Sequence, residues 1–199
     1  MLPLTPAELA PLEDWLTPPE RLAIAYALSQ MRAAWAGLLA LDRRLADAAR
    51  ADREPIMIQL RLAWWRERFG EPASAWPAGE PLLAVLSAWD RERAALAGLV
   101  DGYEARNVGE DGGAELARAR LAAISALARL SGAAEDSAIR DAAAQWLGLP
   151  DAPPKHARLP RAMRPLAILR GMALREASGD AVPAWRAFLV ILRAGLLGR

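Results

Sequence analysis

Hydrophobic residues along the chain recur every three or four positions, which is the spacing of an amphipathic α-helix. The clearest case is residues 55–69, where two lines of side chains lie about a quarter turn apart, at roughly 100° per residue. The first line holds Ile58, Leu62, Trp65 and Phe69, and the second holds Met57, Arg61, Trp64 and Arg68. This helix has two non-polar faces, so we expect it to lie centrally with neighbours on both sides.

Helix start and end signals divide the pattern into a predicted bundle of about eight helices. Thr5 and Thr17 each precede a proline and stand three residues before a glutamate, which predicts a capping box at both positions. Gly70, Gly132 and Gly148 each predict a helix end. The expected helices span 6–14, 18 to the upper thirties, 41–50, 55–69, 81–106, 114–131, 135–148, 159–177 and 181–197.

The composition strengthens the helical prediction. Ala, Leu and Arg dominate, whereas the strand-forming residues Val, Ile, Thr, Tyr and Phe are sparse. Hydrophobic residues make up 54% of the 199 residues and charged residues 25%, which suits a folded chain with a sizeable core. We therefore predict an all-α, single-domain bundle over residues 1–199.

Several classes of protein are disfavoured by what the chain lacks. It has no cysteine, which excludes disulfides and thiolate metal sites. The first residues do not read as a signal peptide, and the longest apolar runs, such as 188–192, are far too short to span a bilayer. We expect a cytoplasmic protein, with peripheral membrane association as an option. A net charge of +1 gives no global field to attract nucleic acid, so no nucleic-acid partner is expected.

The adjacent tryptophans of residues 55–69 have different expected roles. Trp65 falls on the apolar line and reads as core. Trp64 stands one turn from both Arg61 and Arg68, where it could make a cation–π contact or form the wall of an anion pocket. The alternative, which we slightly prefer, is that Trp64 is a core residue covered by the aliphatic stems of these arginines.

Charged residues elsewhere suggest further expectations. Asp42 and Asp47 stand among Arg43, Arg44 and Arg50, and ion pairs along one helix are the simplest interpretation. The lone histidine, His156, is expected in a solvated loop. The most unusual feature is a basic series over 155–175, which could be a solvated face, line an anion pocket or contact anionic lipid. Its members are Lys155, Arg158, Arg161, Arg164, Arg170 and Arg175.

Four segments taken in order resemble the squalene/phytoene synthase family, and in particular a short divergent branch near its mitochondrial complex I assembly factors. They are PPERLAIAYALSQMRAAW (18–35), LRLAWWRER, PLLAVLSAWDRERAALAGLVDGYEARN with its Asp101–Gly102 step, and LPRAMRPLAILRGMALRE. The resemblance implies an all-α isoprenoid synthase bundle. It also implies head-to-head condensation of two prenyl diphosphates on Mg²⁺ ions held by two aspartate-rich motifs.

The chain departs from this family at the residues that would bind the metal. The aspartates of the first motif should fall near positions 32 and 36, where the chain has Arg32 and Ala36. The best match to the second motif, SAIRDAAAQ, retains one carboxylate, Asp141, beside Arg140. Asp141 is therefore only a weak catalytic candidate. We expect no metal site and no cofactor, with Mg²⁺ required only if the chain is an active enzyme.

The sequence thus favours a degenerate family member, a pseudoenzyme that binds a prenyl lipid or a protein partner in the manner of an assembly factor. One alternative is an active Mg²⁺-dependent prenyltransferase that condenses two prenyl diphosphates. Another is a peripheral membrane helix bundle without a ligand. The candidate ligand- or anion-binding residues are Arg21, Tyr26, Arg32, Arg61, Trp64, Arg68 and Arg140.

Overall fold

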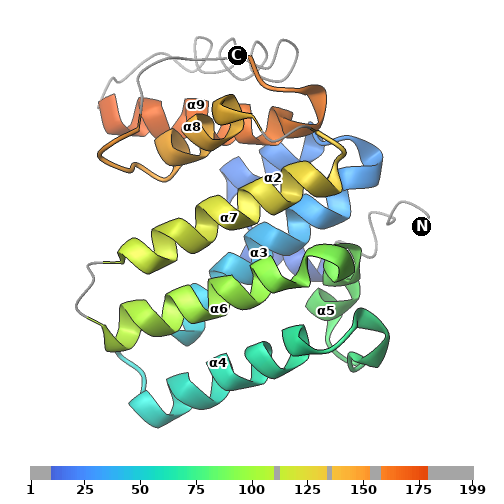
Figure 1. The fold of residues 1–199 in the computed structure, drawn as a ribbon, viewed down its shortest axis with the longest axis vertical. Helices are drawn as coiled ribbons and strands as arrows, with labels where there is room; N and C mark the ends of the chain where they lie inside the picture. Colours follow the sequence, from blue (N-terminus) through green and yellow to red (C-terminus); the bar gives the residue numbers. More distant parts are fainter. Residues whose placement is uncertain (1–9, 110–112, 134–135, 153–157, 179–199) are drawn as a thin grey trace.

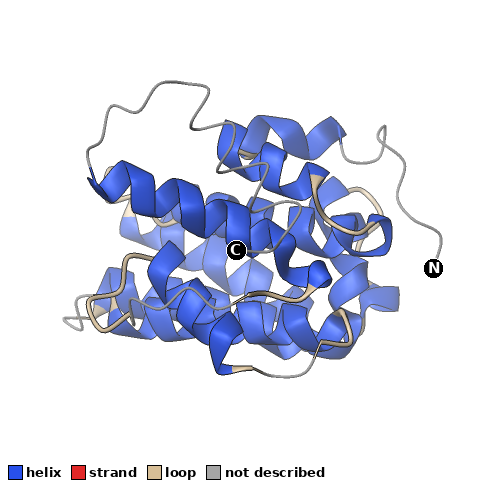
Figure 2. Ribbon diagram, turned by 90° about the horizontal axis from the view of Figure 1, so that it is seen from above, coloured by secondary structure: helices blue, strands red, loops and turns tan. Residues whose placement is uncertain are grey.

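The computed structural model describes residues 10–109, 113–133, 136–152 and 158–178. Every regular element in these ranges is a helix, so the all-α prediction is confirmed (Figure 2). The predicted helix 181–197, the Thr5 capping box, Lys155 and His156 lie outside the described residues.

The α-helices are α2 (Pro18–Ala25), α3 (Arg32–Ala48), α4 (Pro55–Gly70), α5 (Pro81–Leu86), α6 (Arg93–Val108), α7 (Ala114–Leu130), α8 (Ser137–Trp146) and α9 (Arg164–Ser178). Short 3₁₀ helices are η1 (Ala10–Trp15), η2 (Ser29–Met31), η3 (Ala73–Ala75), η4 (Ser87–Glu92) and η5 (Arg161–Met163). Helices α4, α6 and α7 lie side by side with α6 in the middle, and α8, α9 and α2 gather at the opposite end of the bundle (Figure 1). Buried residues from Leu12 to Leu169 form one contiguous core.

Helix α3 is the buried centre of the bundle, and its position explains the first departure from the predicted boundaries. The helix expected from 18 to the upper thirties ends at Ala25, and Leu28 is extended with φ −56° and ψ 139°. Helix α3 then runs without a break through the boundary predicted near residue 40, and residues 33–41 are all buried. Helix α2 packs on α9 while α3 passes through the core, so packing decides where the chain bends.

The predicted helix 81–106 is likewise divided, into α5, η4 and α6. The tighter η4 segment carries Trp89, which is fully buried and donates its indole N–H to the carbonyl of Ala34 at 3.0 Å. Helix α5 packs closely on α3 because Gly37 has no side chain. A Cβ atom at that position would lie 3.0 Å from Leu86 Cδ2. The α5–η4 segment is therefore shaped by its contacts with α3 rather than by its own helical pattern.

One part of the packing predicted for helix α4 is confirmed, and the other part is wrong. Its buried residues are Ile58, Leu62, Trp65 and Phe69, the apolar line predicted from the sequence. The prediction of a central helix with neighbours on both sides is wrong, because α4 lies at the edge of the bundle and packs mainly on α6 (Figure 1). Its second apolar face is consequently open.

Helix ends follow the predicted signals in most places. Glu20 accepts hydrogen bonds from the backbone N–H and the hydroxyl of Thr17 at 2.7 and 2.8 Å. Gly132 and Gly148 end α7 and α8 with φ of 73° and 65°, a conformation that glycine adopts without steric cost. Gly70 instead remains inside α4, which ends when the residue before Pro72 becomes extended.

The α6–α7 pair depends on Gly102. A Cβ atom at this position would lie 2.9 Å from the Cα atom of Leu116 and 3.1 Å from Ala119 Cβ. These distances are too short for any side chain, so the glycine allows the two helix backbones to approach. The Asp101–Gly102 step therefore has a packing role at Gly102, while Asp101 accepts a hydrogen bond from Arg66 of α4 at 2.8 Å.

Candidate ligand pocket

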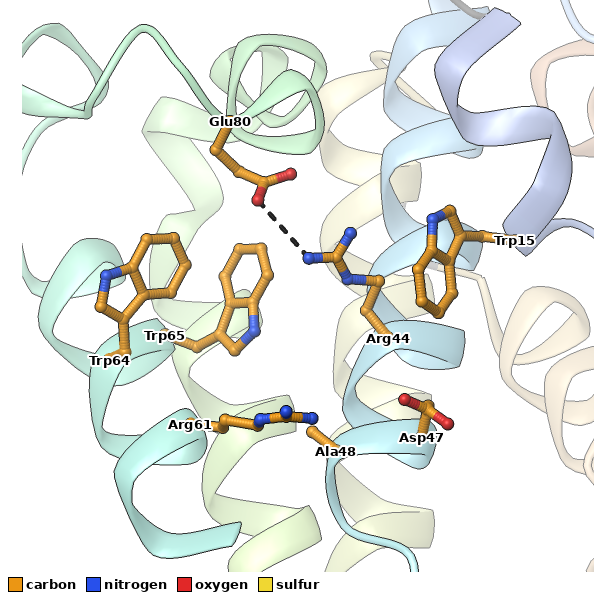
Figure 3. A pocket seen from close by; sticks show the side chains of 8 residues that line it. All are labelled: Trp15, Arg44, Asp47, Ala48, Arg61, Trp64, Trp65 and Glu80. Atoms are coloured by element: carbon orange, nitrogen blue, oxygen red, sulfur yellow. Dashed lines mark hydrogen bonds and ion pairs between the residues drawn. The ribbon is translucent and has the colours of Figure 1, made fainter. Parts of the chain in front are cut away.

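A surface pocket of about 400 Å³ lies between the C-terminal half of α3 and the middle of α4 (Figure 3). Helix η1 closes one side of it, and the start of α5 closes another. This volume falls within the roughly 300–1,000 Å³ that small-molecule sites occupy. The lining residues are Trp15, Arg44, Asp47, Ala48, Arg61, Trp64, Trp65 and Glu80.

Three indole rings provide the apolar part of the lining. Trp65 is 4% exposed because it belongs to the inward line of α4, and it stacks on Phe69 with ring centroids 5.5 Å apart. Trp64 is 38% exposed and meets Trp65 edge to face, with centroids 4.8 Å apart and planes at 83°. Trp15 reaches the pocket from η1 on the opposite side (Figure 3). Of the two sequence interpretations, a pocket wall describes Trp64 better than a covered core residue.

The two arginines of the pocket differ in their contacts. The Arg44 guanidinium lies over the Trp15 ring, 4.5 Å from its centroid, and forms a 3.4 Å ion pair with Glu80. Arg61 is exposed and extends across the pocket toward Ala48 (Figure 3), and no other described residue gives it an ion pair, hydrogen bond or ring contact. Arg61 is therefore a cation without a counter-ion in the described part of the chain.

The cation–π contact suggested for Trp64 occurs instead between Arg44 and Trp15. Arg68, the other arginine expected beside Trp64, pairs with Glu67 at 2.6 Å and with Glu71 at 3.6 Å. It is not among the lining residues.

Both carboxylates of the pocket are already engaged. Asp47 accepts a hydrogen bond from Arg53 at 2.9 Å and pairs with Arg50 at 3.6 Å, as was predicted for Arg50. Glu80 caps α5 by accepting the backbone N–H of Leu82 at 3.2 Å, and it also holds Arg44. Figure 3 places Glu80 and Asp47 on opposite sides of Arg44. Among the described residues, no three carboxylate or imidazole groups come together as a metal site would require.

The prediction that Asp42 pairs with arginines of its own helix is wrong. Asp42 binds Arg120 of α7 through two hydrogen bonds of 3.0 Å, and the Tyr103 hydroxyl of α6 donates to it at 3.0 Å. Burial raises the pKa of the Tyr103 phenol above its ordinary value, and the negative charge of Asp42 raises it further. Burial lowers the pKa of Arg120, but Asp42 and Tyr103 more than offset this and leave it raised. This cluster connects α3, α6 and α7.

The other candidate residues do not line this pocket. Arg21, Arg32 and Arg140 are exposed on α2, α3 and α8, and Tyr26 is half-buried at the end of α2. Asp141, the weak catalytic candidate, is half-buried on α8. Of the predicted binding residues, the structure brings together only Arg61 and Trp64. Trp15 and Arg44 join them from distant parts of the chain, and no sequence motif marks either one.

The basic series over 155–175 does not form one exposed face within the described residues. Arg158 and Arg161 are exposed, whereas Arg170 is 4% exposed and burial lowers the pKa of its guanidinium. A buried arginine cannot contact a lipid headgroup, so Arg170 does not belong to a lipid-binding surface. None of the helices in the described ranges combines the length and the apolar character needed to cross a bilayer.

Comparison of the chain with protein-family models, with curated proteins and with solved structures finds no match.

Proposed function

We propose that this protein is a non-catalytic binding protein, and that the pocket between α3 and α4 holds an anion with an apolar tail, such as a prenyl phosphate. The observation that carries the proposal is Arg61, a cation without a counter-ion among the described residues, placed in a pocket walled by three indoles. Such a site offers one group for the charged head of a ligand and an apolar wall for its chain.

The anionic head is supported by the chemistry of the two arginines. A guanidinium presents several N–H donors in a plane, and it binds phosphate or carboxylate oxygens by paired hydrogen bonds. Arg61 would provide the primary contact, since no described residue competes for it. Arg44 would provide a second contact, because its 3.4 Å pairing with Glu80 is long for a charge-assisted hydrogen bond.

The apolar tail is supported by the aromatic lining. Indole rings provide large apolar surfaces of fixed shape, and burying a hydrocarbon chain against them is favourable. A deeper site is less attractive, because the space beside Asp42 inside the bundle measures only about 10 Å³, roughly what one water molecule needs. The resemblance to the squalene/phytoene synthase family suggests that the tail is a prenyl chain.

The absence of catalysis is supported by the residues available near the pocket. Asp47 and Glu80 are the two carboxylates of the lining, and each is held by arginine partners on its own side of the pocket. Arg32 stands where the resemblance would require an aspartate. The rival activity, Mg²⁺-dependent condensation of prenyl diphosphates, would need carboxylates free to bind the metal.

We predict that Arg61→Gln weakens the binding of farnesyl monophosphate by about tenfold or more, because it removes a charge-assisted contact. The measurement is isothermal titration calorimetry with the full-length protein, compared with wild type. Arg118→Gln is the matched control, since Arg118 is a solvent-exposed arginine on α7 whose pairing with Glu115 spans 3.8 Å.

Farnesol, which has the same chain without the phosphate, should bind wild type and the Arg61→Gln variant equally. Equal affinities of the two proteins for farnesyl monophosphate would contradict the assignment of Arg61. Release of diphosphate from farnesyl diphosphate in the presence of Mg²⁺ would instead establish the rival enzymatic function.

A further inference from the structure

A second pocket, of about 290 Å³, lies where the end of α6, the start of α7 and the end of α8 meet. Its volume is close to the lower end of the range for small-molecule sites. It shares no described lining residue with the pocket between α3 and α4. The larger side chains of its lining are two arginines, Arg106 and Arg120, and three leucines, Leu116, Leu147 and Leu149.

The position of Arg106 follows from the close packing of α6 on α7. Arg106 stands four residues after Gly102, so the two residues lie on the same face of α6. The two backbones approach each other at Gly102, where a Cβ atom would lie 2.9 Å from the Cα atom of Leu116. The pocket is therefore the space one helical turn beyond this contact, with Leu116 on one side of it and Arg106 on the other.

Arg106 is a second cation without a counter-ion in the described part of the chain. It is exposed in the last turn of α6, and no described residue gives it an ion pair, hydrogen bond or ring contact. Glu104 and Glu115, the described carboxylates nearest to it along α6 and α7, pair with other arginines. Glu110 and Asp111 lie outside the described residues. None of the described lining residues is acidic.

Arg120 provides hydrogen-bond donors to the pocket rather than net charge. Its Nε and Nη2 atoms donate to Asp42, and Nη2 also donates to the Tyr103 hydroxyl. Its Nη1 atom makes no hydrogen bond to the described residues. A guanidinium carries five N–H groups in one plane, so Arg120 can hold Asp42 on one edge and donate to a ligand from Nη1. Because Asp42 compensates the charge of Arg120, the pocket carries one net positive charge, on Arg106.

We propose that this pocket binds a small monocarboxylate with an apolar body. The single negative charge of a carboxylate matches the uncompensated charge of Arg106, and its two oxygens can accept from Arg106 and from Nη1 of Arg120. A phosphate monoester carries about two negative charges near neutral pH, so it would bring one more charge than the pocket compensates. The side chains of Leu116, Leu147 and Leu149 provide apolar surface for the hydrocarbon part of the ligand.

Two other interpretations of this place in the fold are weaker. A helix start attracts anions, but here the positive end of the α7 dipole meets the negative end of the α6 dipole, and the two offset each other. An arginine in the last turn also stabilises its own helix. That local role would make Arg106 matter for unfolding and not for binding, which the experiment below separates.

The test is titration of the full-length protein with hexanoate, followed by two-dimensional NMR of the backbone amides. Wild type should show saturable shifts at residues 113–120 and 147–149. Hexan-1-ol, which has the same chain without a charge, should bind about tenfold more weakly or worse, and hexyl phosphate should bind no more tightly than hexanoate. Arg106→Gln should weaken hexanoate binding by about tenfold. Arg118→Gln is the matched control, since Arg118 stands two residues before Arg120 and therefore on another face of α7.

This inference is independent of the proposed prenyl phosphate site. Arg106→Gln should bind farnesyl monophosphate as wild type does, and Arg61→Gln should leave the hexanoate shifts at 113–120 and 147–149 unchanged. Thermal unfolding checks that the variants fold, and Arg120 is left unchanged because it also holds Asp42.

Equal hexanoate affinities of wild type and Arg106→Gln would overturn the proposal and leave Arg106 with the local role at the end of α6. Absence of hexanoate-dependent shifts at 113–120 and 147–149 would overturn it as well. Tighter binding of hexyl phosphate than of hexanoate would contradict the assignment of a monocarboxylate.

Discussion

Trp89→Ala is expected to lower the free energy of unfolding by about 3–5 kcal/mol, which is the range for removing a fully buried tryptophan. The indole of Trp89 is 0% exposed and lies in η4, where the chain tightens between α5 and α6. Its N–H donates to the carbonyl of Ala34 inside α3 at 3.0 Å. The substitution would therefore leave a cavity beside the central helix and remove a buried hydrogen bond at the same time. Since whole domains are stable by only about 5–15 kcal/mol, a loss of this size threatens the fold.

Urea denaturation followed by far-UV circular dichroism measures this effect, because the helical signal reports on the whole bundle. Trp64→Ala is the matched control, since it removes the same side chain from a site that is 38% exposed. The free energy of unfolding should fall much less in Trp64→Ala than in Trp89→Ala. If the two substitutions cost the same, the burial of Trp89 against α3 would not have the structural importance assigned to it.

Asp42→Ala is expected to lower the free energy of unfolding by about 2–4 kcal/mol, near the lower end of the range for removing one partner of a buried pair. The carboxylate accepts two hydrogen bonds from Arg120 and one from Tyr103, and its side chain is 24% exposed. Removing it leaves the Arg120 guanidinium without a carboxylate between α3, α6 and α7, while the Tyr103 hydroxyl keeps its hydrogen bonds to the backbone carbonyl of residue 42 and from Arg120, both at 2.9 Å. The free energy is lost mainly because this charge is left without a counter-ion, rather than through the lost attraction itself.

A double-mutant cycle with Arg120→Ala measures this coupling directly, again by urea denaturation. The double variant should be less destabilised than the sum of the single variants, because neither charge is then left alone. Asp52→Ala is the matched control, since Asp52 also accepts two hydrogen bonds from one arginine, Arg50, but does so in solvent. A loss at Asp52 as large as that at Asp42 would contradict the role given to the cluster.

The parts of this fold that depend on local pattern could be predicted from the sequence. The inward line of α4 contains the predicted Ile58, Leu62, Trp65 and Phe69, because helical spacing alone places them together. The helix ends at Gly132 and Gly148 were also predictable, because glycine readily adopts the left-handed backbone conformation that ends a helix.

The parts that depend on distant contacts could not be predicted. The bend at residues 26–31 and the 3₁₀ segment η4 arise because α3 occupies the centre of the bundle. Asp42 was expected to pair with its neighbours in sequence, yet its partners are 61 and 78 residues away. Helical spacing also made α4 look central, because an exposed apolar face and a buried one have the same pattern.

The candidate pocket combines residues that share one helix with residues that only the tertiary structure brings together. Arg61 and Trp64 were predicted to share a face of one helix, and they do line the same pocket. Trp15 and Arg44 come from η1 and α3, and only the fold places them opposite α4. The sequence therefore named two of the eight lining residues as candidate binding residues, and the tertiary structure was needed to recognise the pocket.

Photo-crosslinking tests the proposed function most directly. A farnesyl monophosphate that carries a diazirine on its chain is irradiated with the full-length protein, and labelled peptides are identified by mass spectrometry. We predict saturable labelling in η1 and around Trp64 of α4, which unlabelled farnesyl monophosphate displaces and Arg61→Gln strongly reduces. Labelling confined to other helices, or labelling at α4 that is indifferent to Arg61→Gln, would contradict a ligand site between α3 and α4.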